Sequence, residues 1–76
     1  TRIGYEAAAP GHVTLTVFDG SGRRIVDLVD RFLTPGRHVA LWDGRDGARR
    51  EVASGVYFYQ LRSEETRITR RMLLVR

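Results

Sequence analysis

Two segments near the end of the chain decide the fold: SGVYFYQLR, residues 54–62, and TRITRRMLLVR, residues 66–76. Both are rich in aromatic, β-branched and aliphatic residues, and a short polar turn separates them. This composition is typical of strands, because such side chains pack well on a pleated surface. Side chains alternate between the faces of a strand. In the first segment they divide into two sets: Tyr57, Tyr59 and Leu61 on one face and Phe58 on the other.

The second segment is apolar on both faces toward its C-terminal end. One face carries Ile68, Arg70, Met72 and Leu74, and the opposite face carries Thr69, Arg71, Leu73 and Val75. Whichever face joins the core, apolar side chains remain on the other. Exposed apolar stripes mark partner surfaces or aggregation-prone sites. The alternative is that both faces are covered, because the strand is central or a loop folds over it, and the sequence leaves both readings open.

The rest of the chain also consists of short strand-like segments separated by turn residues. Glycine and proline separate short apolar segments at intervals of about 8–12 residues, which is typical of an all-β sandwich or barrel. The pattern predicts upstream strands at residues 2–5, 13–18, 23–29 and 37–42. Residues 27–33 resemble a short helical turn, but a hairpin explains residues 25–29 better. We therefore expect one all-β domain over residues 1–76, an immunoglobulin- or fibronectin-like sandwich of about seven antiparallel strands.

Alternation within these strands also predicts the core. Val13, Leu15 and Val17 share one face, which we assign to the core. In the strand at residues 37–42, Val39 and Leu41 share one face and Ala40 and Trp42 the other. We expect the turns to be shaped by residues that permit positive φ or that bond the turn backbone. These are Gly20, Gly22, Gly36, Asp43, Gly44 and Gly55.

Length and composition limit the function classes. A domain of 76 residues buries only about 60% of its unfolded surface. There are no cysteines, so no disulfide or thiol chemistry is available. The net charge is +4 and all 13 basic residues are arginine. Nine acids are scattered among them, so we expect a solvated surface of mixed sign and no nucleic-acid partner.

The ends of the chain and its apolar runs bear on its setting. The longest apolar run, residues 72–75, is far short of the ~20 residues that span a bilayer, so we expect no membrane span. The chain begins at Thr1 without a signal-peptide leader. We therefore expect it to be part of a longer protein.

Candidate metal and catalytic residues are few. Asp43, Asp46 and Glu51 could supply oxygen ligands to calcium, but they lack the usual spacing and Arg45 lies among them. The alternative is a glycine-rich turn in which aspartates accept backbone N–H groups. No Gly-x-Ser-x-Gly motif is present. We expect no catalytic residue, no metal and no cofactor.

Histidines and aromatic residues offer a second set of candidates. His12 and His38 lack the partners of a zinc site, and we expect both to face solvent. Trp42 and the aromatic run at residues 57–59 could stack sugars or bases. We expect most of them in the core, with Trp42 at one end of the sandwich and Phe58 on the outer face.

Read in order, these segments resemble a known family. Residues 1–5, 10–19 and 22–29 resemble the opening of the C-terminal sorting domains of type IX secretion. Residues 36–61, with Trp42-Asp43-Gly44 and Ser54-Gly55-Val56-Tyr57, are similar to the immunoglobulin-like domain of the flagellar hook-capping protein. The ending at residues 69–76 resembles the basic-Met-aliphatic-basic signature of the sorting domains. The resemblance covers essentially the whole chain.

The resemblance implies a fold and a function. Such domains are seven-stranded sandwiches that end secreted bacterial proteins and dock on outer-membrane type IX machinery, and a surface sortase commonly removes them. It implies a secreted or outer-membrane cell-surface location. By motif position, the recognition residues are Arg70, Arg71, Met72, Leu73, Leu74, Val75 and Arg76. Family members usually carry lysine at the positions of Arg70, Arg71 or Arg76. Here all three are arginine, so the positive charge is kept.

Two further hypotheses remain. The domain could be a structural immunoglobulin-like module of a hook-cap or other extracellular protein. It could also form homo-oligomers or filaments, because the strand at residues 2–5 precedes a flexible Ala-Pro-Gly segment and sheet edges accept added strands.

Overall fold

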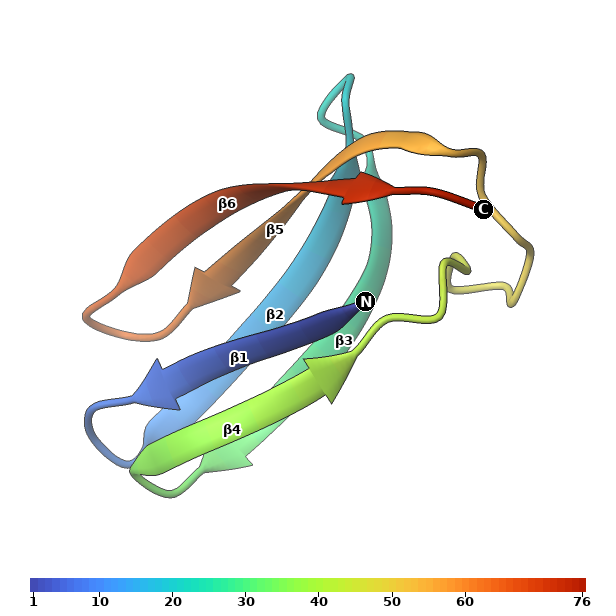
Figure 1. The fold of residues 1–76 in the computed structure, drawn as a ribbon. Helices are drawn as coiled ribbons and strands as arrows, with labels where there is room; N and C mark the ends of the chain where they lie inside the picture. Colours follow the sequence, from blue (N-terminus) through green and yellow to red (C-terminus); the bar gives the residue numbers. More distant parts are fainter.

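The computed structural model describes all residues 1–76. Six strands pair antiparallel and form two facing sheets (Figure 1). The larger sheet has the order β3-β2-β5-β6, and β1 and β4 form a two-stranded sheet against it. The strands are β1 (Arg2–Ala7), β2 (Gly11–Asp19), β3 (Arg24–Leu33), β4 (Gly36–Leu41), β5 (Gly55–Arg62) and β6 (Arg67–Leu74). The expected all-β, sandwich-like fold is confirmed, but with six strands where about seven were expected.

Side chains from both sheets form the core between them. The larger cluster joins Ile3, Tyr5 and Ala40 of the small sheet to residues of the large sheet that include Val13, Leu15 and Leu61. Leu15 and Val17 have no exposed surface. Removing a side chain of this size from water contributes about 1.5–3 kcal/mol. The core face predicted for β2 is therefore confirmed.

A second cluster fills the end of the sandwich below the 43–54 loop. It consists of Val17, Trp42 and Tyr57. The rings of Trp42 and Tyr57 meet edge to face, with centroids 5.0 Å apart, the arrangement that aromatic quadrupoles favour. The indole N–H of Trp42 donates to the Arg45 carbonyl at 3.0 Å, and the Tyr57 hydroxyl donates to the Ala53 carbonyl at 2.7 Å. Both aromatic residues thus belong to the core and also fix the loop.

β3 is longer than the sequence pattern predicted. It extends to Leu33, which pairs with Gly11 of β2, and the pairing of the two strands shifts register between Leu15 and Thr16. A β-bulge of this kind adds a residue to one strand and breaks its alternation. Here Leu28 packs against the core next to the buried Val29. Two consecutive inward side chains explain why residues 27–33 resemble a helical turn. β1 is also longer than expected, since it ends at Ala7 and not at residue 5.

The small sheet exposes apolar side chains on its outer face, and both sheets have free edges. Ala40 of β4 and Trp42 directly after it face the core, whereas Val39 is 51% and Leu41 73% exposed. β3 and β6 are the outer strands of the large sheet, and β1 and β4 are each paired on one side only. No helix long and apolar enough to cross a membrane is present.

Candidate recognition surface on the closing strand

β6 lies at one edge of the large sheet, and its register with β5 assigns its two faces. Met72 is paired with the buried Tyr57, so the face that it shares with Ile68 and Leu74 is the inner one. Leu73 is paired with Val56 on the outer face. Ile68, Met72 and Leu74 are half-buried and pack against the core clusters. These three side chains hold β6 to the domain.

The outer face of β6 is open. Leu73 is 64% and Val75 76% exposed, and Val56 beside Leu73 is 45% exposed. No loop or neighbouring strand covers them, so the question that the sequence left open is answered in favour of an exposed apolar stripe. The predicted site residues therefore divide into two sets: Met72 and Leu74 support the fold, and Leu73 and Val75 face solvent.

Arginine side chains border this stripe. Four residues form a row across the outer face of the large sheet. Arg71 pairs with Phe58, Phe58 with Phe18, and Phe18 with Arg24. The row thus places two half-buried phenylalanines between two exposed arginines on one face of the sheet. Arg24 is 3.6 Å from Asp27, whereas Arg71 makes no ion pair. Phe18 and Val56 join this surface only through the register, which a single-strand pattern does not reveal.

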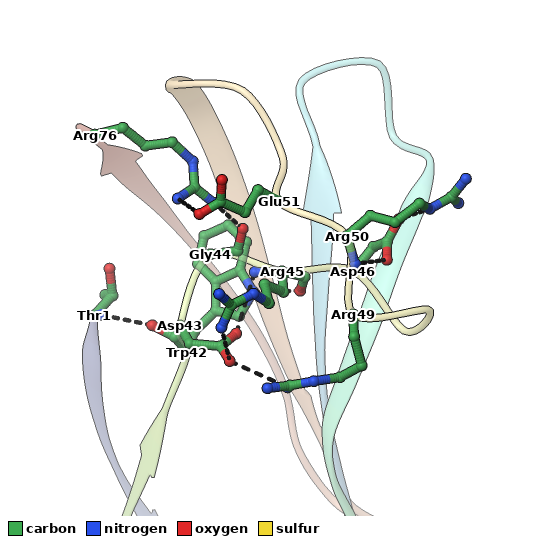
Figure 2. Close-up of polar contacts among 10 residues, drawn as sticks. All are labelled: Thr1, Trp42, Asp43, Gly44, Arg45, Asp46, Arg49, Arg50, Glu51 and Arg76. Carbon is green, nitrogen blue, oxygen red and sulfur yellow. Dashed lines mark hydrogen bonds and ion pairs between the residues drawn. The ribbon is translucent and has the colours of Figure 1, made fainter.

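Arg76, in contrast, is held by the domain itself (Figure 2). Its guanidinium donates to the carbonyls of Val52, at 2.5 Å, and of Gly44, and lies 3.2 Å from the Glu51 carboxylate. Its backbone N–H donates to the Ser54 hydroxyl at 3.1 Å. The side chain is 32% exposed. Of the residues predicted for recognition, Arg76 is thus the one whose charge is already satisfied by the 43–54 loop.

Gly44 makes this arrangement possible. Its φ is +75°, in the left-handed region that glycine tolerates best. A Cβ at this position would stand 2.7 Å from the Arg76 guanidinium. The sequence predicted a turn here but gave no sign of the arginine, because Arg76 is 32 residues away. Of the other predicted turn glycines, Gly22, Gly36 and Gly55 have positive φ, but Gly20 does not.

Aspartates organise the loops at this end of the sandwich. Asp46 accepts the N–H groups of Ala48 and Arg50 and pairs with the Arg50 side chain at 3.1 Å. Asp43 accepts the Arg45 N–H at 3.2 Å and pairs with Arg49. These are the turn contacts given as the alternative to a calcium site. The carboxylates do not converge, and no group of three or more metal-ligating side chains is present.

These hydrogen bonds and ion pairs lower the pKa values of the turn aspartates. The pKa of Asp46 lies below its ordinary value because the Arg50 N–H and further donors favour the charged form over the cost of burial. For Asp43, burial acts to raise the pKa, but the charges of Arg49 and Arg45 and a backbone N–H together lower it. The pKa of Asp19 is lowered chiefly by the Ser21 hydroxyl and the Arg23 N–H.

Neither histidine belongs to the closing strand. His12 is exposed on β2, with its ring 2.5 Å from Asp30. His38 is half-buried, stacked on Tyr5 with centroids 5.5 Å apart, so the expectation that it faces solvent is wrong. On β6, by contrast, exposed apolar side chains and arginines without an ion pair lie together.

Comparison with known proteins adds no relative to this picture. No family model matches the chain, and neither a curated protein nor a solved structure matches it.

Proposed function

We propose that this chain is a non-catalytic sorting domain of type IX secretion, with an immunoglobulin-like sandwich related to that of the hook-capping protein. It directs a longer precursor through the outer-membrane machinery to the surface of a bacterium. The order and spacing of its motifs support this assignment over the whole chain. The observation that carries it is the open outer face of β6, where Leu73 and Val75 stand exposed beside the unpaired Arg71.

The domain leaves apolar side chains uncovered on its closing strand. A small domain has little apolar surface to spare for its core, yet this one exposes aliphatic side chains on the strand that closes it. β6 keeps its place through its inner face and through Arg76. Its outer face is therefore free for a partner without loss of the fold. We assign recognition to Arg71, Leu73 and Val75 on the outer face, and to Arg70, which alternates with them onto the inner side but is exposed at the sheet edge. Met72, Leu74 and Arg76 have a supporting role.

A fusion experiment tests the assignment. Residues 1–76 are placed after a periplasmic reporter in a host with type IX secretion, and the reporter is measured on cells and in the medium. We expect export that depends on the type IX outer-membrane machinery. Retention of the reporter in the periplasm, with the fused domain shown to be folded, would contradict the proposal.

A second candidate is a structural immunoglobulin-like module of a hook-cap or extracellular protein, which self-assembles by strand addition. The outer face of the small sheet favours it, because Val39 and Leu41 are exposed and β1 has a free edge. Sedimentation over a range of concentrations tests it. A monomer at the highest concentration would count against assembly.

A further inference from the structure

The free edge of β6 is a template for another strand. No strand of this chain pairs with its far side. In an antiparallel pair, the backbone groups of every second residue point away from the partner. At the turn, the Ser63 N–H donates to the Thr66 carbonyl at 2.8 Å, which sets the phase of this alternation. The residues whose backbone groups point to the free edge are therefore Arg67, Thr69, Arg71 and Leu73.

The charge along this edge is of one sign. Arg67, Arg70 and Arg71 are exposed, and none of them takes part in an ion pair. Glu64 and Glu65 in the adjacent turn do not reach them. Most other arginines in the protein pair with a carboxylate. β6 thus presents cations without an ion partner beside backbone groups that no strand occupies; among them, only the Thr69 carbonyl accepts a side-chain hydrogen bond, from the Arg70 guanidinium at 3.4 Å.

This pattern selects against a second copy of the chain. A symmetric antiparallel pair of two β6 strands centred on Arg71 would place the Arg71 side chains of the two copies opposite each other. Like charges that face each other across a ladder are destabilising, and charged side chains on an edge strand are a common means of preventing self-pairing. An acidic strand would meet the opposite situation, because each carboxylate would find an arginine without a partner.

We propose that the free edge of β6 binds an extended acidic segment of another protein, which joins the large sheet as its fifth strand. Main-chain hydrogen bonds to Arg67, Thr69, Arg71 and Leu73 hold it, as in other strand-addition complexes. Its carboxylates lie beside Arg67 and Arg71, and its aliphatic side chains lie beside Leu73. The proposal rests on the proposed function in placing recognition on β6, and it adds the chemistry of the partner.

Two synthetic peptides test the inference. The acidic probe is Val-Thr-Val-Thr-Glu-Glu-Thr-Thr-Glu, whose glutamates match the arginines in an antiparallel register. The basic probe has lysine in place of each glutamate. Each is titrated into isotope-labelled protein at low ionic strength, and amide chemical shifts are followed. We expect the acidic probe to shift the amides of β6 in preference to those of β3, and the basic probe to cause no saturable change.

Three variants separate the contributions. Arg71→Glu should weaken the acidic probe about fivefold, since it turns an attraction across the ladder into a repulsion. Arg31→Glu is the matched control, because Arg31 is also exposed and unpaired but lies on β3 at the opposite edge; it should leave affinity unchanged. Leu73→Pro removes an N–H that points to the free edge and leaves the ladder with β5 intact. It should abolish binding without changing the melting temperature by more than a few degrees.

Several outcomes would overturn the proposal. One is equal affinity for both probes, and another is equal weakening by Arg71→Glu and Arg31→Glu. A dimer that Leu73→Pro dissociates would make a second copy the occupant. Binding to phosphatidylglycerol vesicles, with no binding of the acidic probe, would point to a lipid surface. Because these assays use the purified domain, their failure with intact reporter export would remove only this inference, whereas loss of export would remove the proposed function.

Discussion

The guanidinium of Arg76 ties the closing strand to the loop that follows β4. It is surrounded by two carbonyl oxygens and the Glu51 carboxylate, and it is about two-thirds buried. Hydrogen bonds to a charged group stabilise more than neutral ones, at about 1.5–3 kcal/mol, and solvent contact reduces that figure. At the scale of single residues, this contact therefore decides how firmly the end of β6 is held.

Removing the Arg76 side chain should destabilise the domain. We expect Arg76→Ala to lower the free energy of unfolding by about 1.5 kcal/mol, because the Gly44 and Val52 carbonyls lose their donor. Urea denaturation measures the change. Arg49→Ala is the matched control: this arginine is mostly exposed and pairs only with Asp43, so we expect a change within about 0.5 kcal/mol.

Gly44 and Arg76 should be energetically coupled. In the wild type, Gly44→Ala brings a Cβ within 2.7 Å of the guanidinium and strains a backbone at φ +75°. We expect a cost of about 2 kcal/mol, falling to about 1 kcal/mol in the Arg76→Ala background, where only the backbone strain remains. Additive effects in this double-mutant cycle would show that the two residues do not meet.

The aspartate turns predict how stability depends on pH. The pKa of Asp46 in the fold is lower than its ordinary value of 3.8, so the folded state favours the charged carboxylate. This stabilisation is complete above the unfolded pKa of 3.8 and is lost as pH falls through the lower folded value. We expect the melting temperature to fall below about pH 4. Asp46→Asn should melt lower than the wild type at neutral pH, and the difference should shrink in acid.

Among the strands, β2 and β6 differ in how much they contribute to the stability of the fold. β2 is paired on both sides and contains the most deeply buried residues, whereas β6 is an edge strand with one open face. The sequence predicted the core faces of β2 and β5, because the pairing of these two strands is unbroken and their side chains alternate regularly between the faces. It did not predict the full length of β3, because the bulge near Leu15 depends on the pairing of two strands.

Two leucines provide a test of this difference. Leu15→Ala should cost about 3 kcal/mol, since it leaves a cavity at a position with no exposed surface. Leu73→Ala should change stability by less than about 0.5 kcal/mol, because the side chain is 64% exposed. Urea denaturation of both variants measures the contrast. A large loss of stability in Leu73→Ala would mean that the outer face of β6 supports the fold.

At the scale of the whole molecule, the packing of the two sheets decides which apolar side chains stay exposed, and therefore where the candidate site lies. The alternation in β6 predicted that one apolar face would remain outside the core, but it could not tell whether a loop covers that face. Only the arrangement of the sheets decides this, as it also decides that Val39 and Leu41 are exposed on the opposite side. The hydrogen bonds of Arg76 could not be predicted from the sequence, because its partners lie in the distant 43–54 loop.

The most direct measurement compares export by two doubly substituted domains fused to the same reporter. Leu73→Ser with Val75→Ser changes the outer face of β6, and Val39→Ser with Leu41→Ser removes similarly exposed apolar side chains from β4. Both should keep a melting temperature close to that of the wild type. We predict that the β6 pair loses export and the β4 pair retains it. Equal export by the two folded variants would contradict the assignment of recognition to the closing strand.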